Sequence, residues 1–240
     1  MHNAAFRALG LDWRYELLDI EHEGLSKAVA GLCARDVAGA NVTVPYKVAV
    51  MQHLAGLEAD ALRAHAVNTI IRDGERLVGD NTDVAAIRAA VAGLRVEPRG
   101  ADVVVLGAGG SARAAAVALE GAHITFVSRH PEDVELPGKV VGWSDPSWSR
   151  LVRTSALLIN ATPLGRRDEM PLPPRALPTD GAVIDLVYVD GGTPLVRKAR
   201  SLGLRAADGW GVLLAQGARS FELWTGRPAP LDVMREALQA

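Results

Sequence analysis

Residues 102–112 read DVVVLGAGGSA, and the fold expected of the surrounding chain follows from them. Four consecutive apolar residues come after Asp102, a pattern typical of a strand that is buried on both faces. Gly107 permits a tight turn, Gly109 lets the backbone come close to a ligand, and Ala112 allows a helix to pack closely on the strand. The segment therefore predicts a strand, a glycine-rich turn and a helix.

Similar apolar runs recur further along the chain, separated by helical or irregular segments, at residues 124–127, 157–160 and 183–186. Residues 85–94 have helical spacing and lead into the first strand. This alternation is typical of a parallel α/β sheet. We expect residues 84–208 to form a Rossmann domain.

The loop between the first strand and its helix predicts a dinucleotide site, because a helix N-terminus offers free N–H groups and a positive dipole to phosphates. Sites that prefer NAD place an acid about 20 residues after the first glycine. Here the second strand ends in Ser128-Arg129-His130, and a guanidinium suits a 2′-phosphate. Alternatively, Arg129 is an exposed arginine at a strand end with no role in binding. We expect NADP as the cofactor. The expected cofactor-binding residues of this region are Gly107, Ala108, Gly109, Gly110, Ser111, Ala112, Ser128 and Arg129.

The first 83 residues predict a smaller α/β domain. Local patterns indicate helices at 4–9, 25–34 and 46–54, strands at 15–20 and 41–44, and a hairpin formed by 67–72 and 76–78 around Asp73-Gly74. Two apolar helices at 211–223 and 231–238 need a surface to pack on. We expect them to return to this domain, so that residues 1–83 plus 209–240 form one unit.

Composition excludes several classes of protein. A formal net charge of −2, with basic residues scattered among acidic ones, gives no reason to expect nucleic acid or an anionic membrane as partner. Cys33 is the one cysteine, which excludes an internal disulfide and a cysteine-based zinc cluster, and we expect it buried in a helix. There is neither an apolar run of about 20 residues nor an export signal. We expect a cytoplasmic protein, either monomer or homodimer.

Residues 41–47, NVTVPYK, place Asn41 and Thr43 on one side of an extended segment, because residues i and i+2 point the same way. Pro45 can begin the next helix, and Lys47 then lies in its first turn. Taken alone, Lys47 can be an ordinary solvated lysine, and Asp83 can be only the N-cap of the following helix.

The order of motifs narrows these alternatives. The chain carries NVTVPYK at 41–47, AVNT at 66–69, GDNTD at 79–83, GAGGSA at 107–112, NATPLG at 160–165 and GWG with QG at 209–217. In this order, over essentially the whole chain, it resembles the shikimate dehydrogenase family. The motifs outside the glycine loop are much more specific than the loop itself.

The resemblance implies roles for individual residues. Lys47 and Asp83 match the family's catalytic lysine and its carboxylate partner. The substrate-binding residues implied by the resemblance are Asn41, Thr43, Asn68, Thr82, Tyr188 and Gln216. Asn160, Thr162 and Gly209 complete the implied cofactor site. The implied reaction is the reversible reduction of 3-dehydroshikimate to shikimate by NADPH, in the route to aromatic amino acids.

These residue types fit that chemistry. A hydroxyl loses its proton as hydride leaves its carbon, so a base must contact the oxygen, and an acid must do so in reverse. Amide and hydroxyl side chains both donate and accept, which suits a substrate rich in hydroxyls. No metal is expected. Two alternatives stay open: a quinate and shikimate dehydrogenase that uses NAD, and a non-catalytic dinucleotide-binding module.

The chain departs from the family pattern at its beginning. Members normally start with a strand and a Ser-x-Ser segment that holds the substrate carboxylate, before the Met-His-Asn that forms residues 1–3 here. We expect that Met1 is an internal methionine taken as a start or that the chain was trimmed, with weaker carboxylate binding as a result. Ser128-Arg129-His130 replaces the usual Asn-Arg-Thr, and Val84 stands where a glycine often follows the aspartate.

Overall fold

The computed structural model describes residues 1–34 and 36–239. The chain divides into two compact units, Met1–Asp83 with Leu213–Ala240, and Val84–Val212. The chain re-enters the first unit at Leu213, whereas the sequence patterns predict that it does so at residue 209.

The first unit contains a four-stranded sheet in the order β1-β3-β4-β2. Its strands are β1 (Gly39–Asn41), β2 (Gly56–Leu57), β3 (Thr69–Asp73) and β4 (Arg76–Asp80). The expected hairpin is confirmed, since β3 and β4 pair antiparallel with Asp73 opposite Arg76. Gly39 has to lack a side chain, because a Cβ there would overlap the Ile70 carbonyl and the Trp224 ring.

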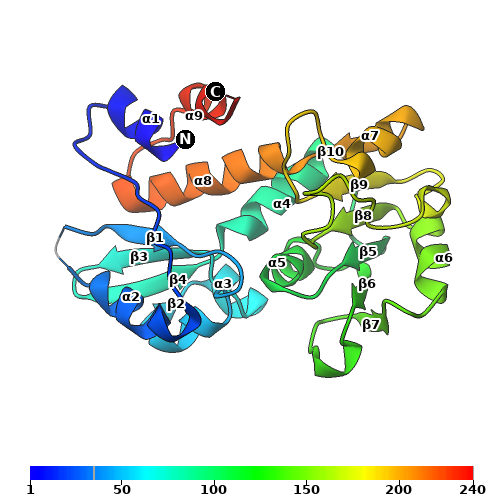
Figure 1. Ribbon diagram of the computed structural model, residues 1–240, viewed down its shortest axis with the longest axis horizontal. Coiled ribbons are helices and arrows are strands. Elements are labelled where there is room, and N and C mark those ends of the chain that lie inside the picture. The colour runs from blue at the N-terminus through cyan, green and yellow to red at the C-terminus, as the bar shows by residue number, and fades with distance from the viewer. Residues whose placement is uncertain (35, 240) are drawn as a thin grey trace. The chain divides into compact units, whose positions relative to one another are not determined.

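The first unit also contains helices, most of which are labelled in Figure 1. They are α1 (His2–Ala8), η1 (His22–Gly24), α2 (Leu25–Gly31), η2 (Ala49–His53), α3 (Ala59–Ala64) and α9 (Leu231–Gln239). The long helix α8 (Gly209–Thr225) enters the first unit at Leu213, and α1 lies beside α9. Phe6, Phe221 and Met234 bury their side chains between these helices. The C-terminal helices therefore return to the first unit, as expected.

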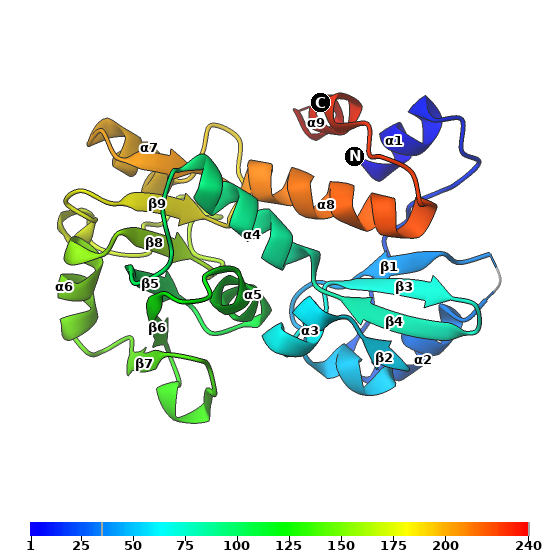
Figure 2. The ribbon, with the colours of Figure 1, turned by 180° about the vertical axis from the view of Figure 1, so that it is seen from behind.

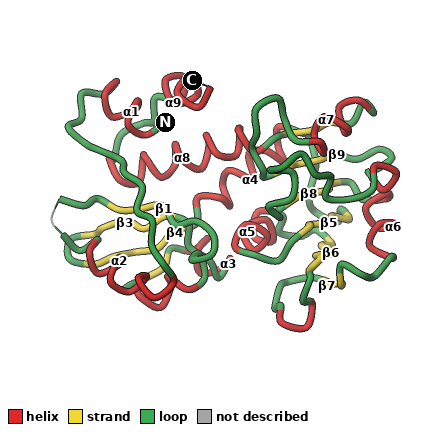
Figure 3. Tube along the Cα trace, in the orientation of Figure 1, coloured by secondary structure: helices red, strands yellow, loops and turns green. Residues whose placement is uncertain are grey.

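The expected strand at residues 15–20 is wrong. Residues 11–20 have no regular secondary structure, as the green tube of Figure 3 shows, and the Leu17 side chain is 97% exposed. A strand needs a neighbouring strand for its backbone bonds. The Tyr15 N–H donates instead to the Asn3 side chain at 2.7 Å, and the Tyr15 carbonyl accepts from the same side chain at 2.9 Å.

The helix expected at residues 46–54 is also largely wrong. The chain turns at 44–48 and then forms only the short η2, so that Lys47 lies in the turn rather than in a helix begun by Pro45. The Lys47 carbonyl accepts a hydrogen bond from the Val67 N–H at 2.7 Å. That tertiary bond uses the acceptor that a continuing α-helix would need.

Cys33 was expected to be buried, and it is exposed. Helix α2 ends at Gly31, so Cys33 lies in the turn that follows rather than on the apolar face of the helix.

The second unit has a six-stranded parallel sheet in the order β10-β9-β8-β5-β6-β7. Its strands are β5 (Asp102–Leu106), β6 (His123–Ser128), β7 (Lys139–Gly142), β8 (Leu157–Asn160), β9 (Ala182–Asp185) and β10 (Arg205–Ala207). The expected parallel α/β sheet is confirmed. Strands β7 and β10 were not predicted from the sequence. The central strands β5 and β8 are almost wholly buried, in agreement with their continuous apolar runs.

Helices cover both faces of the parallel sheet, with α5 and α6 on opposite sides (Figures 1 and 2). They are α4 (Thr82–Gly93, entering this unit at Val84), η3 (Pro131–Asp133), α5 (Gly110–Ala118), α6 (Ser147–Thr154), η4 (Pro174–Ala176) and α7 (Pro194–Ser201). The chain passes from β5 through α5 to β6 on one side, while β8 pairs with the other edge of β5. Ligands of such sheets bind at the carboxyl ends of the strands where the order reverses, here β5 and β8. Among the described residues, no helix is both long enough and apolar enough to cross a bilayer.

Candidate active site

A lysine and an aspartate pair closely in the first unit. The Lys47 Nζ lies 2.6 Å from the Asp83 Oδ2, and both side chains are 12% exposed. Lys47 comes from the turn before η2, and Asp83 from the first turn of α4. Lys47 is thus not a freely solvated lysine, and Asp83 does more than begin a helix.

An amide holds the other oxygen of the aspartate. The Asn68 Nδ2 donates to the Asp83 Oδ1 at 2.9 Å, while the Asn68 Oδ1 accepts from the Thr82 N–H at 2.8 Å. Because a backbone N–H can only donate, it fixes which end of the amide faces the carboxylate. Asn68 is 2% exposed, so this orientation is set inside the protein.

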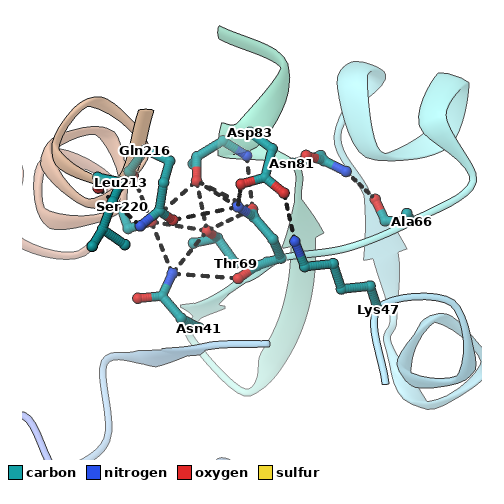
Figure 4. A network of polar contacts seen from close by, with 11 residues as sticks. Asn41, Lys47, Ala66, Thr69, Asn81, Asp83, Leu213, Gln216 and Ser220 are labelled. Atoms are coloured by element: carbon teal, nitrogen blue, oxygen red, sulfur yellow. Dashed lines mark hydrogen bonds and ion pairs between the residues drawn. The ribbon is translucent and has the colours of Figure 1, made fainter. Parts of the chain in front are cut away.

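Three buried hydroxyls gather beside this amide, from three different elements (Figure 4). Thr69 Oγ1 lies 2.9 Å from Ser220 Oγ and 3.2 Å from Thr82 Oγ1, and all three residues are at most 2% exposed. Asn41 Nδ2 donates to the cluster, at 3.2 Å from Thr69 and 3.0 Å from Ser220. The cluster joins strands β1 and β3 to helices α4 and α8.

The remaining residues of the first unit that were predicted to bind substrate differ in their surroundings. The Gln216 Oε1 lies 3.5 Å from the Asn68 Nδ2, so Gln216 borders the same network. Thr43 is exposed, and its carbonyl accepts from the Tyr46 N–H. The structure therefore brings Asn41, Lys47, Asn68, Asp83 and Gln216 together, with Thr82 among them and Thr43 at the exposed margin.

Sequence reasoning missed several polar groups of this network, among them the hydroxyls of Tyr15 and Ser220. The Tyr15 hydroxyl donates to the Asn41 Oδ1 at 3.0 Å, and burial raises the pKa of that phenol. The ring of His2 stacks on Tyr15, with centroids 4.6 Å apart. Burial, aided by the positive charge of the amino terminus, lowers the pKa of His2 to about 4. Ser220 carried one usable signal, since it lies one helical turn after Gln216 on the same face.

In the second unit, the glycine loop has the backbone that the sequence predicts. Gly107 has φ +105°, where other residues are strained, and α5 begins at Gly110 with no side-chain cap. A Cβ at Gly109 would meet nothing within 4 Å, so packing does not require that glycine. Open space in front of an uncapped helix N-terminus fits a phosphate group. Ala108 and Ser111 are partly exposed in the loop, and Ala112 is fully buried against the sheet.

At the neighbouring strand end, Ser128 is buried and Arg129 is exposed. The Ser128 Oγ accepts from the His130 N–H at 3.2 Å, which shapes the turn after β6. The ligand atoms of His130, Glu132 and Asp133 lie within 4.8 Å of one another, a grouping that sequence spacing did not suggest. All three are exposed, and exposed acidic groups commonly gather without an ion.

Asn160 and Asp185 form a buried pair at the carboxyl ends of β8 and β9. The Asn160 Nδ2 donates to the Asp185 Oδ1 at 2.9 Å, and the Asn160 Oδ1 accepts from the Thr162 hydroxyl at 2.7 Å. Burial raises the pKa of the Asp185 carboxyl, and hydrogen bonds from Thr193, Val187 and Asn160 offset part of that effect. Sequence reasoning missed Asp185, which fixes the amide that in turn shapes the loop around Thr162.

Tyr188 and Gly209 also belong to the second unit. The Tyr188 side chain is 43% exposed, and its ring lies 5.1 Å from that of Trp210 between centroids. The Gly209 N–H donates to the Val187 carbonyl at 3.3 Å, and a Cβ at Gly209 would overlap the backbone of Leu186 and Val187. Gly209 is therefore required by close packing of backbone on backbone.

Comparisons with known proteins agree with this arrangement. Residues 1–70 match the model of the shikimate dehydrogenase substrate binding domain, and residues 209–239 match that of the shikimate 5′-dehydrogenase C-terminal domain. The chain is 37% identical over 257 residues to a shikimate dehydrogenase (NADP⁺) of Desulforamulus reducens, covering 99% of this chain and 88% of that protein.

Solved structures give the same result. A shikimate 5-dehydrogenase of Thermus thermophilus, in complex with NADP(H) and shikimate, has a TM-score of 0.87 and 35% identity, covering 99% of this chain and 92% of that one. A ligand-free 5-ketofructose reductase of a Gluconobacter strain has a TM-score of 0.82 and 34% identity, covering 99% and 91%. With relatives at these identities over nearly its whole length, the chain belongs to the shikimate dehydrogenase family.

Proposed function

We propose that this protein catalyses the reversible, NADP-dependent reduction of 3-dehydroshikimate to shikimate. The observation that carries the proposal is the paired Lys47 and Asp83 beside a buried cluster of amides and hydroxyls. Family membership supports it, as do the names of relatives that are NADP-dependent shikimate dehydrogenases.

In this proposal, Lys47 exchanges the proton with the reacting hydroxyl. During reduction the Lys47 ammonium donates a proton to the substrate oxygen, and during oxidation the lysine takes it back. Asp83 holds the ammonium in place at 2.6 Å, and Asn68 holds the other carboxylate oxygen. When bound, the nicotinamide supplies or accepts the hydride.

Amide and hydroxyl side chains bind the substrate's other oxygens by hydrogen bonds in this proposal. Asn41, Asn68 and Gln216 each offer a donor and an acceptor, which suits an alcohol that does both. We assign Thr43, Thr82 and Tyr188 to the same task, as the family resemblance implies. An alcohol that lacks one of these hydroxyls leaves a partner unsatisfied, which costs about 1–3 kcal/mol for a buried group.

We assign NADP to the second unit. The open space at Gly109 and the uncapped start of α5 fit the pyrophosphate, and the exposed Arg129 at the end of β6 fits a 2′-phosphate. Asn160, Thr162 and Gly209 complete the proposed site. Apart from Tyr188 and Gly209, residues 1–83 and 209–240 then serve the substrate, and residues 84–208 serve the cofactor.

An absorbance assay of the reduced nicotinamide tests the proposal. Purified protein is offered shikimate, quinate or the reduced form of 5-ketofructose, each with NADP and with NAD. Turnover of shikimate with NADP at the highest kcat/KM is the expected result. A preference for quinate with NAD would contradict the proposal and would favour a quinate and shikimate dehydrogenase that uses NAD.

Two further outcomes are informative. If only the reduced form of 5-ketofructose is turned over, the protein would have the activity named for the Gluconobacter relative. Cofactor binding without turnover of any of the three would favour a non-catalytic module. We place the protein in the cytoplasm as a monomer or homodimer, which fractionation and gel filtration check.

A further inference from the structure

Ser220 lies at the centre of the hydroxyl cluster, where neither the sequence motifs nor the family resemblance placed a functional residue. It is fully buried on α8, one turn after Gln216 (Figure 4). Its hydroxyl donates to the Gln216 carbonyl at 3.0 Å. The same oxygen lies 3.0 Å from Asn41 Nδ2, 2.9 Å from Thr69 Oγ1 and 3.3 Å from Thr82 Oγ1.

A count of hydrogens gives the direction of these bonds. A serine hydroxyl has one hydrogen and two lone pairs, and a carbonyl can only accept. The hydrogen of Ser220 is used by the Gln216 carbonyl, so Ser220 acts as an acceptor toward the Asn41 amide. Its second lone pair is open to the Thr69 hydroxyl.

This bond is the shortest of those that orient the Asn41 amide. The Asn41 Nδ2 has three acceptors in reach, and Ser220 at 3.0 Å is nearer than Thr69 at 3.2 Å or the Asn68 carbonyl at 3.3 Å. With the nitrogen held on that side, the Asn41 Oδ1 faces the Tyr15 hydroxyl at 3.0 Å and keeps one lone pair for another donor.

We infer that Ser220 is a positioning residue for substrate binding: it holds Asn41 so that the amide oxygen is presented to a substrate hydroxyl. The inference rests on the proposed function for the identity of the substrate, but not for the orientation of Asn41. Ser220 acts through Asn41 and need not contact the substrate.

The same helix provides a matched control. The Thr225 hydroxyl donates to the Phe221 carbonyl at 2.7 Å, the same bond to the residue four positions earlier that Ser220 makes. The other contacts of the Thr225 hydroxyl are with the backbone of Arg227. Removing each hydroxyl takes away one such helical bond, but only the loss of Ser220 removes the nearest acceptor of the Asn41 amide.

Steady-state kinetics provide the first test. In Ser220→Ala the KM for shikimate is expected to rise about two- to tenfold, the range for one lost hydrogen bond, with kcat within about twofold and the KM for NADP unchanged. Thr225→Ala should leave all three constants as in the parent. An unchanged KM in Ser220→Ala, or an equal rise in Thr225→Ala, would overturn the inference.

A double-mutant cycle shows whether Ser220 acts through Asn41. Once Asn41→Ala has removed the amide, the further change Ser220→Ala should leave the KM for shikimate as it is in Asn41→Ala. Independent multiplication of the two effects would mean that Ser220 acts by another route.

A substrate-free measurement separates this inference from the proposed function. The Asn41 side-chain amide resonances should shift and broaden in Ser220→Ala and stay in place in Thr225→Ala. If the parent turns over no shikimate, the proposed function fails, and the resonances still decide the role of Ser220. Resonances that do not move in Ser220→Ala would refute it.

Discussion

Lys47 Nζ and Asp83 Oδ2 lie 2.6 Å apart, although 36 positions separate the two residues along the chain. The pair is held from both ends. Lys47 lies in the turn before η2, and its carbonyl accepts a hydrogen bond from the Val67 N–H. Asn68 donates a hydrogen bond to the second oxygen of Asp83. A largely buried ammonium in a fixed position can deliver a proton to one oxygen of a substrate, which a mobile surface lysine cannot do as effectively.

Replacement of Lys47 by alanine should abolish most turnover while NADP still binds. General acid–base catalysis contributes roughly 10²–10⁴-fold, so kcat should fall by about that factor. Stopped-flow or steady-state assays with shikimate measure the loss, and fluorescence titration measures NADP binding. Lys27→Ala, at an exposed lysine on α2, is the control and should behave as the parent. A Lys47→Ala enzyme with near-parental kcat would exclude the proton-transfer role.

Replacement of Arg129 by alanine should weaken NADP much more than NAD. Hydrogen bonds to a charged group contribute about 1.5–3 kcal/mol, which corresponds to a rise in the KM for NADP of roughly ten- to hundredfold. The KM for NAD should change little, because NAD lacks the 2′-phosphate. Arg150→Ala, at an exposed arginine of α6, is the matched control. Equal weakening of both cofactors would remove Arg129 from 2′-phosphate recognition.

Stability should fall as the pH drops from 6.5 to 4 because of His2. Its folded pKa of about 4 lies below the ordinary value of 6.5, so in this window the unfolded chain binds the proton and the folded protein does not. The free energy of unfolding should therefore decrease by up to about 1.4 kcal/mol per pH unit from this group. Urea unfolding of the parent and of His2→Leu, which cannot titrate, measures the difference.

The control for that experiment is His123→Gln, because His123 is exposed. The free energy of unfolding of His2→Leu should rise relative to that of the parent as the pH is lowered through the window. Above the window, the difference between the two free energies should be constant. A difference that does not vary with pH would show that His2 titrates alike in the folded and unfolded states.

Asp185 should act in the opposite direction. Its folded pKa is raised above 3.8, chiefly by burial, so the folded protein keeps a proton that the unfolded chain has already lost. Stability from this group is highest below pH 3.8 and declines as the pH rises through the folded pKa. Asp185→Asn preserves the shape and removes the ionisation, so its stability relative to the parent should improve with rising pH.

Unfolding of Asp185→Asn and the parent across the acid range checks this expectation. The variant keeps a side-chain oxygen that can accept from Val187 and Asn160, and its amide faces Thr193. A relative stability that worsens with rising pH would mean that the ionised carboxylate is favoured by folding.

The central strands of the second unit were the easiest elements to predict. β5 and β8 are continuous apolar runs with the bounds that the sequence indicated, because burial on both faces leaves no polar position to obscure the pattern. The glycine turn and the β3–β4 hairpin were equally local, since a positive φ or a two-residue turn selects its residues directly. The edge strand β10 lacked such a signal because its residues are only partly buried.

Two of the wrong predictions lie where a distant partner took a backbone group. Residues 15–20 have the composition of a strand, but the polar backbone groups of Tyr15 are bonded to Asn3. Residues 46–54 have helical spacing, but the Lys47 carbonyl is bonded to Val67. Local propensity is a weak energy compared with a satisfied tertiary hydrogen bond, so the pattern was overruled in both places.

The order of residues along the chain was enough to establish the residue types of the site, its glycine loop and the family, because motifs and their spacing are properties of the chain. The folded arrangement was needed to establish that Lys47 is paired, that Asn68 bridges to Asp83, and that Ser220 holds Asn41. A hydrogen bond requires two atoms to lie within about 3 Å of each other, which no local pattern specifies. Ser220 and Asn41 are 179 positions apart, and only folding brings them to that distance.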